Sequence, residues 1–167
     1  MANLALVGGD HDRAALLYDE SIDVHRRGRD AWGLAILLSI AAGLRIIRGD
    51  LALASEQATE AMELSEALED PRGVAWSLEV FAGILAAGGN VGAAARVWGA
   101  SDALLETAGG SVLPTIGWIR ERHIGPVRLS LGEPAFEALR VEGRSMTSTE
   151  AIDFVHRQAR SDVKSTM

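Results

Sequence analysis

The chain has 167 residues, and 48% of them are hydrophobic, which is enough apolar material for the core of one domain. The 16 Lys and Arg are outnumbered by 23 Asp and Glu, so the formal net charge of −7 argues against nucleic acid as a direct partner, because phosphate binding needs clustered basic residues. Cysteine is absent, which excludes a disulfide framework and a thiolate metal site.

The composition favours helices, because alanine and leucine are abundant while aromatic residues make up only 5% and proline occurs four times. No signal peptide is visible, since the short apolar stretch after Met1 lacks a basic segment before it. Residues 31–44 form an uncharged run of 14 residues, which falls short of the roughly 20 needed to cross a bilayer. We therefore expect this run to be a core helix of a cytoplasmic protein, with no membrane contact.

Three consecutive helices are predicted for residues 10–27, 30–48 and 50–68. An aspartate stands at the start of each, where its side chain can accept a hydrogen bond from a free backbone N–H. The glycine that precedes Asp10 and Asp50 supplies the turn between helices. The next two helices are predicted at 70–88 and 90–107, with Pro71 at the first helical position, where no amide donor is needed.

These helices repeat at an interval of 40 residues. Residues 30–50 align with residues 70–90 without a gap, and a constant period between 20 and 50 residues indicates a solenoid of stacked two-helix units. Small residues recur where neighbouring helices would approach closely, and a helix flanked by others needs no polar face. The identical pairs are Asp30 and Asp70, Gly33 and Gly73, Ala35 and Ala75, Leu38 and Leu78, Ala42 and Ala82, Gly43 and Gly83, and Gly49 and Gly89.

The period weakens after residue 108. Residues 108–114 read as a loop, and the helix predicted at 115–130 should be broken or kinked near Gly125-Pro126. Pro134 is expected to start a further helix that ends near Glu142. Thr147 and Glu150 form a capping box before a terminal amphipathic helix, and residues 161–167 are expected to be disordered.

A two-helix unit with Gly-Asp at its turn, and with Ala54 four residues after Asp50, resembles a tetratricopeptide repeat. The 40-residue spacing and the segments "DPRGVA" (70–75), "AARVWGASDALLETAGG" (94–110) and "LGEPAFEALRVEGRSMTSTEAIDFV" (131–155) are similar to the C-terminal repeats of MalT-like and LuxR-type multidomain regulators of bacteria, especially actinobacteria. Those regulators carry an ATPase module upstream and often a helix-turn-helix. Neither is found in this sequence, which thus reads as one module of a longer protein or a stand-alone relic.

The resemblance implies an all-α fold of about eight helices, in antiparallel pairs stacked as a right-handed solenoid. It divides a single domain, 1–160, into units at 9–48, 49–88 and 89–130 and a degenerate closing unit at 131–160.

No pattern for catalysis or cofactor binding is present. The sequence lacks the phosphate-binding G-x-x-x-x-G-K-[ST] motif, no G-x-G-x-x-G follows a strand, and the four histidines are scattered. We therefore expect a protein that is not an enzyme and that binds no cofactor and no metal. The acidic stripe of the third helix is interpreted as a solvated outer face; it consists of Glu56, Glu60, Glu63 and Glu66.

The remaining candidate is a groove. In tetratricopeptide stacks the first helix of each unit lines a concave surface, and this resemblance places Ile36 and Ser39 of one unit and Trp76 and Glu79 of the next there. The alternative is that Trp76 only packs between helices. A second candidate patch runs from Trp118 to His123 and includes Arg122; it could meet an acidic partner or simply be an exposed helix face.

These observations predict a non-catalytic module of a signalling or transcription-control protein. It would recognise a protein, a peptide, a small effector or other domains of a longer regulator. The alternative is a structural scaffold or self-association domain, such as a homodimer, whose groove binds nothing specific. The two differ in whether the groove is filled by a partner or left empty beside a large apolar contact between copies.

Overall fold

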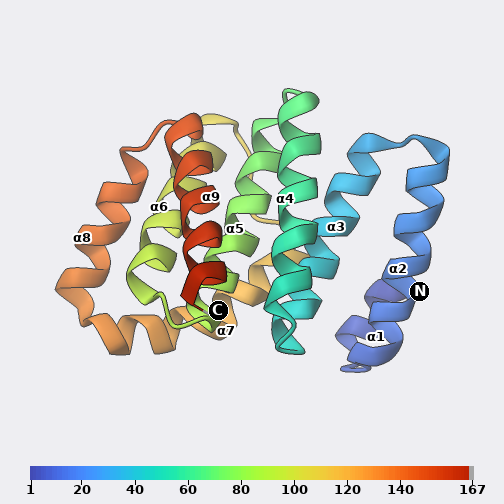
Figure 1. The fold of residues 1–167 in the computed structure, drawn as a ribbon, viewed down its shortest axis with the longest axis horizontal. Coiled ribbons are helices and arrows are strands. Elements are labelled where there is room, and N and C mark those ends of the chain that lie inside the picture. Colours follow the sequence, from blue (N-terminus) through green and yellow to red (C-terminus); the bar gives the residue numbers. More distant parts are fainter. Residues whose placement is uncertain (166–167) are drawn as a thin grey trace.

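The computed structural model describes the backbone of residues 1–165 and the side chains other than those of Val7 and residues 160–165. This part of the chain is all-helical, with nine α-helices and no strand (Figure 1). The helix beyond the predicted eight is α1, Ala2–Val7, a short helix that packs on α2.

Five helices form the repeated part of the molecule, and their bounds agree with the predicted ones to within about a residue. The aspartate or asparagine before each helix accepts a hydrogen bond from a backbone N–H two or three residues later, as predicted. Gly9, Gly49 and Gly89 close the turns with positive φ, a conformation that favours glycine. The helices are α2 (His11–Gly28), α3 (Ala31–Ile47), α4 (Leu51–Ala67), α5 (Pro71–Ala87) and α6 (Val91–Thr107).

Consecutive helices pack against one another, and α3 also packs on α5. Figure 1 shows α3 and α5 behind α4, so these two helices form an inner layer. Both are buried along most of their length, which explains the uncharged run at 31–44. Within the described residues, no helix is long and apolar enough to cross a membrane.

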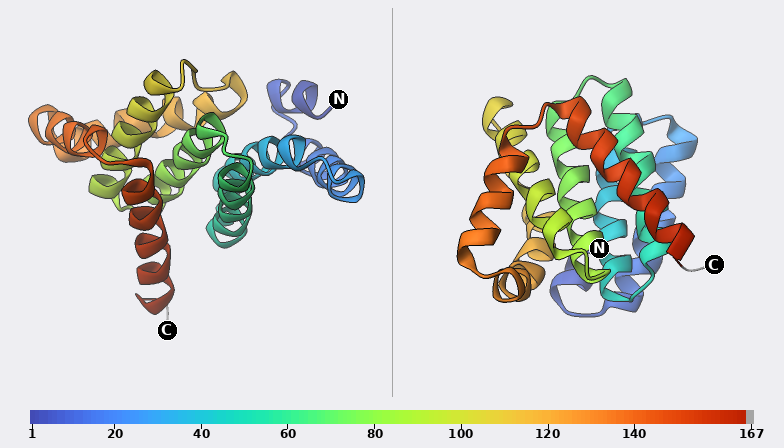
Figure 2. Two further views of the ribbon diagram at one scale, coloured as in Figure 1. Left: turned by 90° about the horizontal axis from the view of Figure 1, so that it is seen from above. Right: turned by 60° about the vertical axis from the view of Figure 1, so that its left-hand side comes forward.

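The last three helices lie outside the 40-residue period. They are α7 (Pro114–Leu131), α8 (Glu133–Arg144) and α9 (Ser148–Ser165). α7 packs on α3 and α5, α8 packs on α6, and α9 packs on α5 and α6. Seen from above, α7 and α9 lie on opposite sides of α5 (Figure 2). The C-terminal half of the stack is therefore covered on both sides by the chain itself.

The structure differs from the expectations for this region at two places. Of the two alternatives predicted near Gly125-Pro126, a break or a kink, the break does not occur, because α7 is one continuous helix through both residues. Proline leaves the carbonyl of Arg122 without its usual N–H partner, but this turn is exposed, so water can take that place. The predicted disordered tail is helical as far as Ser165, since α9 continues to that residue; residues 166–167 lie outside the described part.

The small residues at the repeat positions lie at close helix contacts, as predicted. Ala42 and Ala82 are completely buried. Gly43 and Gly83 face Ile119 of α7, whose side chain occupies the space that a Cβ atom at either glycine would need. We expected these small residues to contact neighbouring helices of the repeat. At the two glycines the approaching helix is instead α7, which lies outside the repeat.

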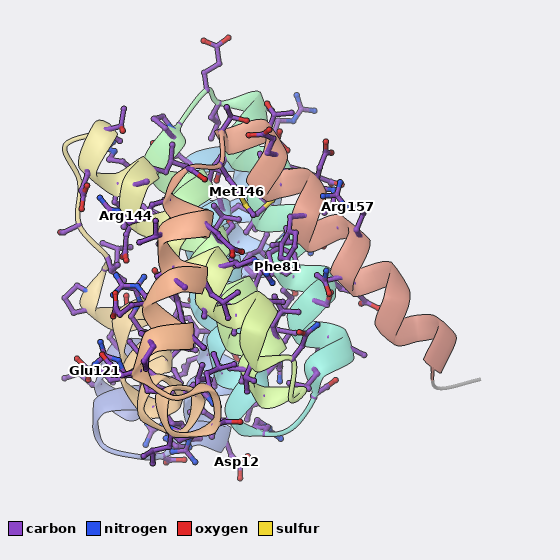
Figure 3. All side chains as sticks on the ribbon, turned by 90° about the vertical axis from the view of Figure 1, so that its left-hand side faces the viewer. Asp12, Phe81, Glu121, Arg144, Met146 and Arg157 are labelled. Atoms are coloured by element: carbon purple, nitrogen blue, oxygen red, sulfur yellow. The ribbon has the colours of Figure 1, made fainter. Side chains whose placement is uncertain are left out.

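The capping box at the start of α9 is also confirmed. The Thr147 hydroxyl accepts a hydrogen bond from the Glu150 N–H at 3.2 Å, and the Glu150 carboxylate accepts one from the Thr147 N–H at 2.8 Å. Met146, labelled in Figure 3, lies at the junction of α8 and α9.

Candidate functional site

The predicted groove residues lie on the inner helices, where the chain itself covers them. Ile36 and Ser39 belong to α3, and Trp76 and Glu79 belong to α5. Ser111 contacts Trp76, and Arg120 contacts Glu79. Ser39, Trp76 and Glu79 are buried, and only Ile36 is partly exposed. These four residues therefore do not form an open groove.

Trp76 packs between segments of the chain. Its indole Nε1 donates a hydrogen bond to the backbone carbonyl of Ser111 at 3.0 Å, and 7% of the residue is exposed. The ring thus anchors the segment that leads into α7. This favours the packing interpretation of Trp76 over a role in contacting a ligand.

Glu79 is a buried charge with a buried partner. Its carboxylate accepts hydrogen bonds from the guanidinium of Arg120 on α7, one of them at 3.0 Å from Nε. Arg120 also donates to Asp102 of α6 at 2.7 Å, and Asp102 pairs with Arg140 of α8. One network of four charged side chains therefore joins α5, α6, α7 and α8.

The protonation of this network follows from its burial. Loss of solvent raises the pKa of the Glu79 carboxyl, and the charge of Arg120 opposes that rise without cancelling it. Burial lowers the pKa of the Arg120 guanidinium, but the carboxylates of Glu79 and Asp102 outweigh it and leave the pKa above its ordinary value. Burying this ion pair costs solvation free energy, and its hydrogen bonds compensate for that cost. We therefore interpret the pair as a structural contact that holds α7 on α5.

The second candidate patch is part of the same assembly. Trp118 lies against Gly43, and its Nε1 donates to the Thr115 carbonyl at 2.7 Å. Arg122 is exposed, and burial together with the charge of Arg122 lowers the pKa of His123. The two predicted patches therefore meet at the contact between Arg120 and Glu79, while Arg122 lies outside that contact.

Little of the inner groove stays open. A pocket of about 10 Å³ remains between the N-terminal ends of α3 and α5, and the structure brings Ile36, Ser39 and Trp76 of the predicted groove together in its lining. That volume holds about one water molecule. Trp32 is half exposed at its mouth, and its Nε1 donates to Asp70 at 3.3 Å.

Two larger hollows lie in the N-terminal half. One of about 310 Å³ lies between α2 and α4, with Leu38 of α3 at its base. The other, of about 270 Å³, lies between α1 and α2 beside Met1, Leu4 and Leu17. Exposed apolar side chains occur on these same two helices and at the chain start; they are Met1, Leu4, Leu16 and Val24.

The acidic stripe of α4 faces solvent over most of its length, as predicted. Glu56, Glu63 and Glu66 are exposed, whereas Glu60 is partly buried and pairs with Arg26 of α2 at 2.7 Å. Among the described residues, no group of three or more His, Asp or Glu side chains is placed to hold a metal ion.

The chain is similar to curated bacterial proteins. It is 26% identical over 157 residues to proteins of Mycobacterium bovis and of two strains of Mycobacterium tuberculosis, whose names describe them provisionally as HTH-type transcriptional regulators. The match covers 94% of this chain but 17% of each relative, so the chain spans under a fifth of their length. No protein-family model matches the chain, and no solved structure matches it significantly.

Sequence reasoning missed the most important residue of this region, Ile119. Gly43 and Gly83 were a usable signal, because two glycines at the same repeat position indicate that something approaches closely. A signal for the ion pair was also present, since Glu79 is the one acidic residue within the apolar stretch at 73–87. Neither signal identifies α7 as the partner.

Proposed function

We propose that the chain is a non-catalytic interaction module of a bacterial transcription-control protein, built as a tetratricopeptide-like, right-handed helical stack and working in the cytoplasm. The observation that carries this proposal is the match of 94% of the chain to part of mycobacterial proteins named as transcriptional regulators. The LuxR-type context is part of the proposal and rests on the repeat spacing and the segments quoted above.

The geometry supports recognition at the outer surfaces of the stack. The inner groove is filled by α7, and the network of Glu79, Arg120 and Asp102 holds that helix in place. In the N-terminal half, by contrast, hollows of about 270 and 310 Å³ remain open. A partner protein or peptide therefore finds accessible surface there without displacing part of the fold.

Transcript analysis in the source bacterium tests this function. In-frame deletion of the codons for residues 1–160 should change the transcript levels of a defined set of genes, and an intact copy should restore them. A transcriptome that stays unchanged, under a condition in which immunoblotting detects the protein, would contradict the proposal.

The purified chain should not bind DNA by itself. Its acidic residues outnumber its basic ones, and Glu150 and Asp153 lie in the first turns of α9, where a recognition helix would meet phosphates. Fluorescence anisotropy with duplex DNA at low ionic strength measures this. Salt-sensitive micromolar binding would show that the chain itself contacts DNA.

A second function, self-association, is favoured by one observation. Met1, Leu4, Leu16 and Val24 leave exposed apolar surface at the N-terminal end of the stack. If copies of the chain associate there, sedimentation velocity should detect a dimer that the variant Leu4→Glu/Leu16→Glu converts to monomer. A wild-type chain that stays monomeric at about 100 µM would speak against this alternative, because stable dimers form well below that concentration.

A further inference from the structure

The repeat places two equivalent grooves on the outer face of the stack. In each, two outer helices flank an inner one: α2 and α4 flank α3, and α4 and α6 flank α5. In neither groove do the two outer helices pack closely on each other. Figure 1 shows α9 in front of the second groove and no segment of the described chain in front of the first.

The second groove shows what kind of element fits such a place. α9 packs on α5 and α6 through an apolar face whose buried residues are Ala151, Ile152 and Val155. At the rim, the Asn90 amide donates a hydrogen bond to Gln158 at 2.9 Å. Figure 3 shows Phe81, a buried residue of α5, on the side of the molecule where α9 lies. An amphipathic helix thus covers this groove.

The first groove has an apolar base and acidic walls. Ile22 and Leu38 lie at its base and Leu53 lies on the α4 side, around a space of about 310 Å³. This volume suits several side chains of a docked helix rather than a single small residue. Ile22 and Leu38 are themselves buried, so the apolar surface open to a partner is narrow, and Leu53 supplies its partly exposed side chain.

The walls carry more negative than positive charge. Asp19 pairs with Arg45 at 2.6 Å, and Glu60 pairs with Arg26 at 2.7 Å. Asp23 and Glu56 add two exposed carboxylates to the lining, and the charge of Asp23 also helps to raise the pKa of the nearby Arg26. The lining therefore carries an excess of negative charge that a cationic partner would neutralise.

Gln57 adds a polar group that needs a partner. Its side-chain Oε1 is buried and accepts no hydrogen bond from the part of the chain that the structure describes. It lies on the α4 wall of the same groove. A buried acceptor without a donor is costly, and a docked Lys or Arg side chain would supply the missing donor once the Gln57 amide turned its oxygen outward.

We propose that the groove between α2 and α4 binds a basic amphipathic helix of a partner protein. An apolar side chain of that helix would lie on Leu53, above the buried Ile22 and Leu38, and its Lys or Arg side chains would meet Asp23 and Glu56. This is recognition of a helix in a groove, with charge complementarity selecting the partner. The inference rests on the proposed function, because it names the partner class of an interaction module.

A designed peptide provides the probe. It has about 18 residues, with leucine every three or four positions and lysine and alanine elsewhere, so that it forms a basic amphipathic helix. Two control peptides are a scrambled version without the helical period and a version with glutamate in place of lysine. Fluorescence anisotropy with the full chain is measured at low ionic strength and again at roughly 0.15 M salt.

Binding should require both the charge and the helical period. The basic amphipathic peptide should bind with micromolar affinity, more weakly at the higher salt concentration, and more tightly than either control. The double variant Asp23→Asn/Glu56→Gln should weaken binding by roughly threefold to tenfold, the effect of losing two exposed charge contacts. Glu66→Gln is the matched control, because it removes a carboxylate from α4 outside the groove lining and should leave affinity unchanged.

A charge swap makes the test independent of general attraction to an acidic protein. The variant Asp23→Lys/Glu56→Lys should prefer the glutamate peptide over the lysine peptide. All substituted positions are exposed, and circular dichroism should confirm that each variant stays helical.

Several outcomes would overturn the inference. One is equal binding of the helical and scrambled basic peptides, and another is an equal loss with Glu66→Gln. A dimer in sedimentation velocity that Asp23→Asn/Glu56→Gln dissociates would identify a second copy of the chain as the occupant instead. None of these results alters the transcript readout of the residue 1–160 deletion, so failure of the groove and failure of the proposed function are distinguishable.

Discussion

The N-terminal and C-terminal halves of the repeated helices follow the same 40-residue spacing, yet only the second half is covered on both sides. Around α5, the chain places α7 on the inner side and α9 on the outer side. Around α3, the inner side receives part of α7, while the outer side keeps a groove of about 310 Å³. Equal units thus have unequal surroundings.

This difference shows that the repeat specifies the packing of α2 to α6 but not which other helices cover them. The covering helices come from residues 114–165, which follow no 40-residue period. Their contacts use particular side chains, such as Ile119 against two glycines and Arg120 against Glu79. Four experiments test whether these particular contacts hold the covering helices in place.

The largest effect is expected from Arg120→Met, which leaves the Glu79 carboxylate buried without its main partner. Removing one member of a buried ion pair costs about 3–5 kcal/mol, so the free energy of unfolding at neutral pH should fall by that order. Chemical denaturation followed by circular dichroism measures it. The variant Arg26→Met, which removes the exposed pair with Glu60 between α2 and α4, is the control and should cost less than about 1 kcal/mol.

The loss in Arg120→Met should also depend on pH. Burial already raises the pKa of Glu79, and removing the positive charge raises it further. A raised carboxyl pKa means that the folded chain keeps a proton that the unfolded chain releases, so stability is lost as pH rises from the unfolded value, about 4.3, through the folded pKa. The variant should therefore be closest to wild type near pH 4. A constant difference between pH 4 and 8 would show that Glu79 is not the group responsible.

Gly143→Ala tests how tightly α8 is joined to α6. A Cβ atom at Gly143 would fall on the backbone carbonyl of Arg96, and one at Gly99 would fall on that of Arg140. Because backbone cannot move aside as a side chain can, overpacking should lower the unfolding free energy by about 2–3 kcal/mol. Gly92→Ala is the matched control on α6, where the nearest atom is Leu139 Cδ1 at 3.8 Å, and it should be neutral or slightly stabilising.

A double-mutant cycle tests the contact of α7 with the inner helices. The Ile119 Cδ1 atom faces Gly43, whereas its Cγ2 atom faces Gly83. Ile119→Val removes Cδ1 but keeps the Cγ2 methyl. It should therefore reduce the destabilisation caused by Gly43→Ala by about 1 kcal/mol and leave the destabilisation caused by Gly83→Ala unchanged. The helix-propensity gain of each Gly→Ala change cancels in the cycle. Equal coupling at both glycines would mean that α7 is placed differently.

The smallest effect concerns the start of α9. Hydrogen bonds from the backbone and hydroxyl of Thr147 lower the pKa of the exposed Glu150. A lowered pKa contributes stability that is present above the ordinary glutamate value, about 4.3, and is lost as pH falls through the folded pKa. Glu150→Gln should therefore lower the melting temperature slightly at pH 7 and not at pH 2.5. Asp153→Asn, one turn further into α9, is the control, because it removes an exposed carboxylate that takes no part in the capping box.

Much of the helical framework could be predicted from the sequence. The starts of α3 and α5 follow from Asp30 and Asp70, and the turns before α4 and α6 follow from Gly49 and Gly89. These signals are local, because a cap or a turn needs only residues within a few positions of it. Pro126 shows the limit of such rules, because α7 continues through it without the break that was one of the two predicted outcomes, and an exposed turn tolerates a missing hydrogen bond.

The candidate site could not be predicted in the same way. From the sequence, Trp76 and Glu79 are equally compatible with an open groove and with a buried contact, because both depend on what packs above them. The decisive partners, Ser111 and Arg120, lie 35 and 41 residues away along the chain. No period or spacing connects those positions.

Local sequence signals account for the 40-residue unit: its length, its caps, its turns and the apolar character of the inner helices. The accessible surfaces follow instead from packing between distant segments, which places Ile119 between Gly43 and Gly83 and leaves Asp23 and Glu56 exposed beside an uncovered groove. The physical reason is that helix formation depends on neighbours along the chain, whereas the burial of a surface depends on the shape and charge of whichever distant segment reaches it.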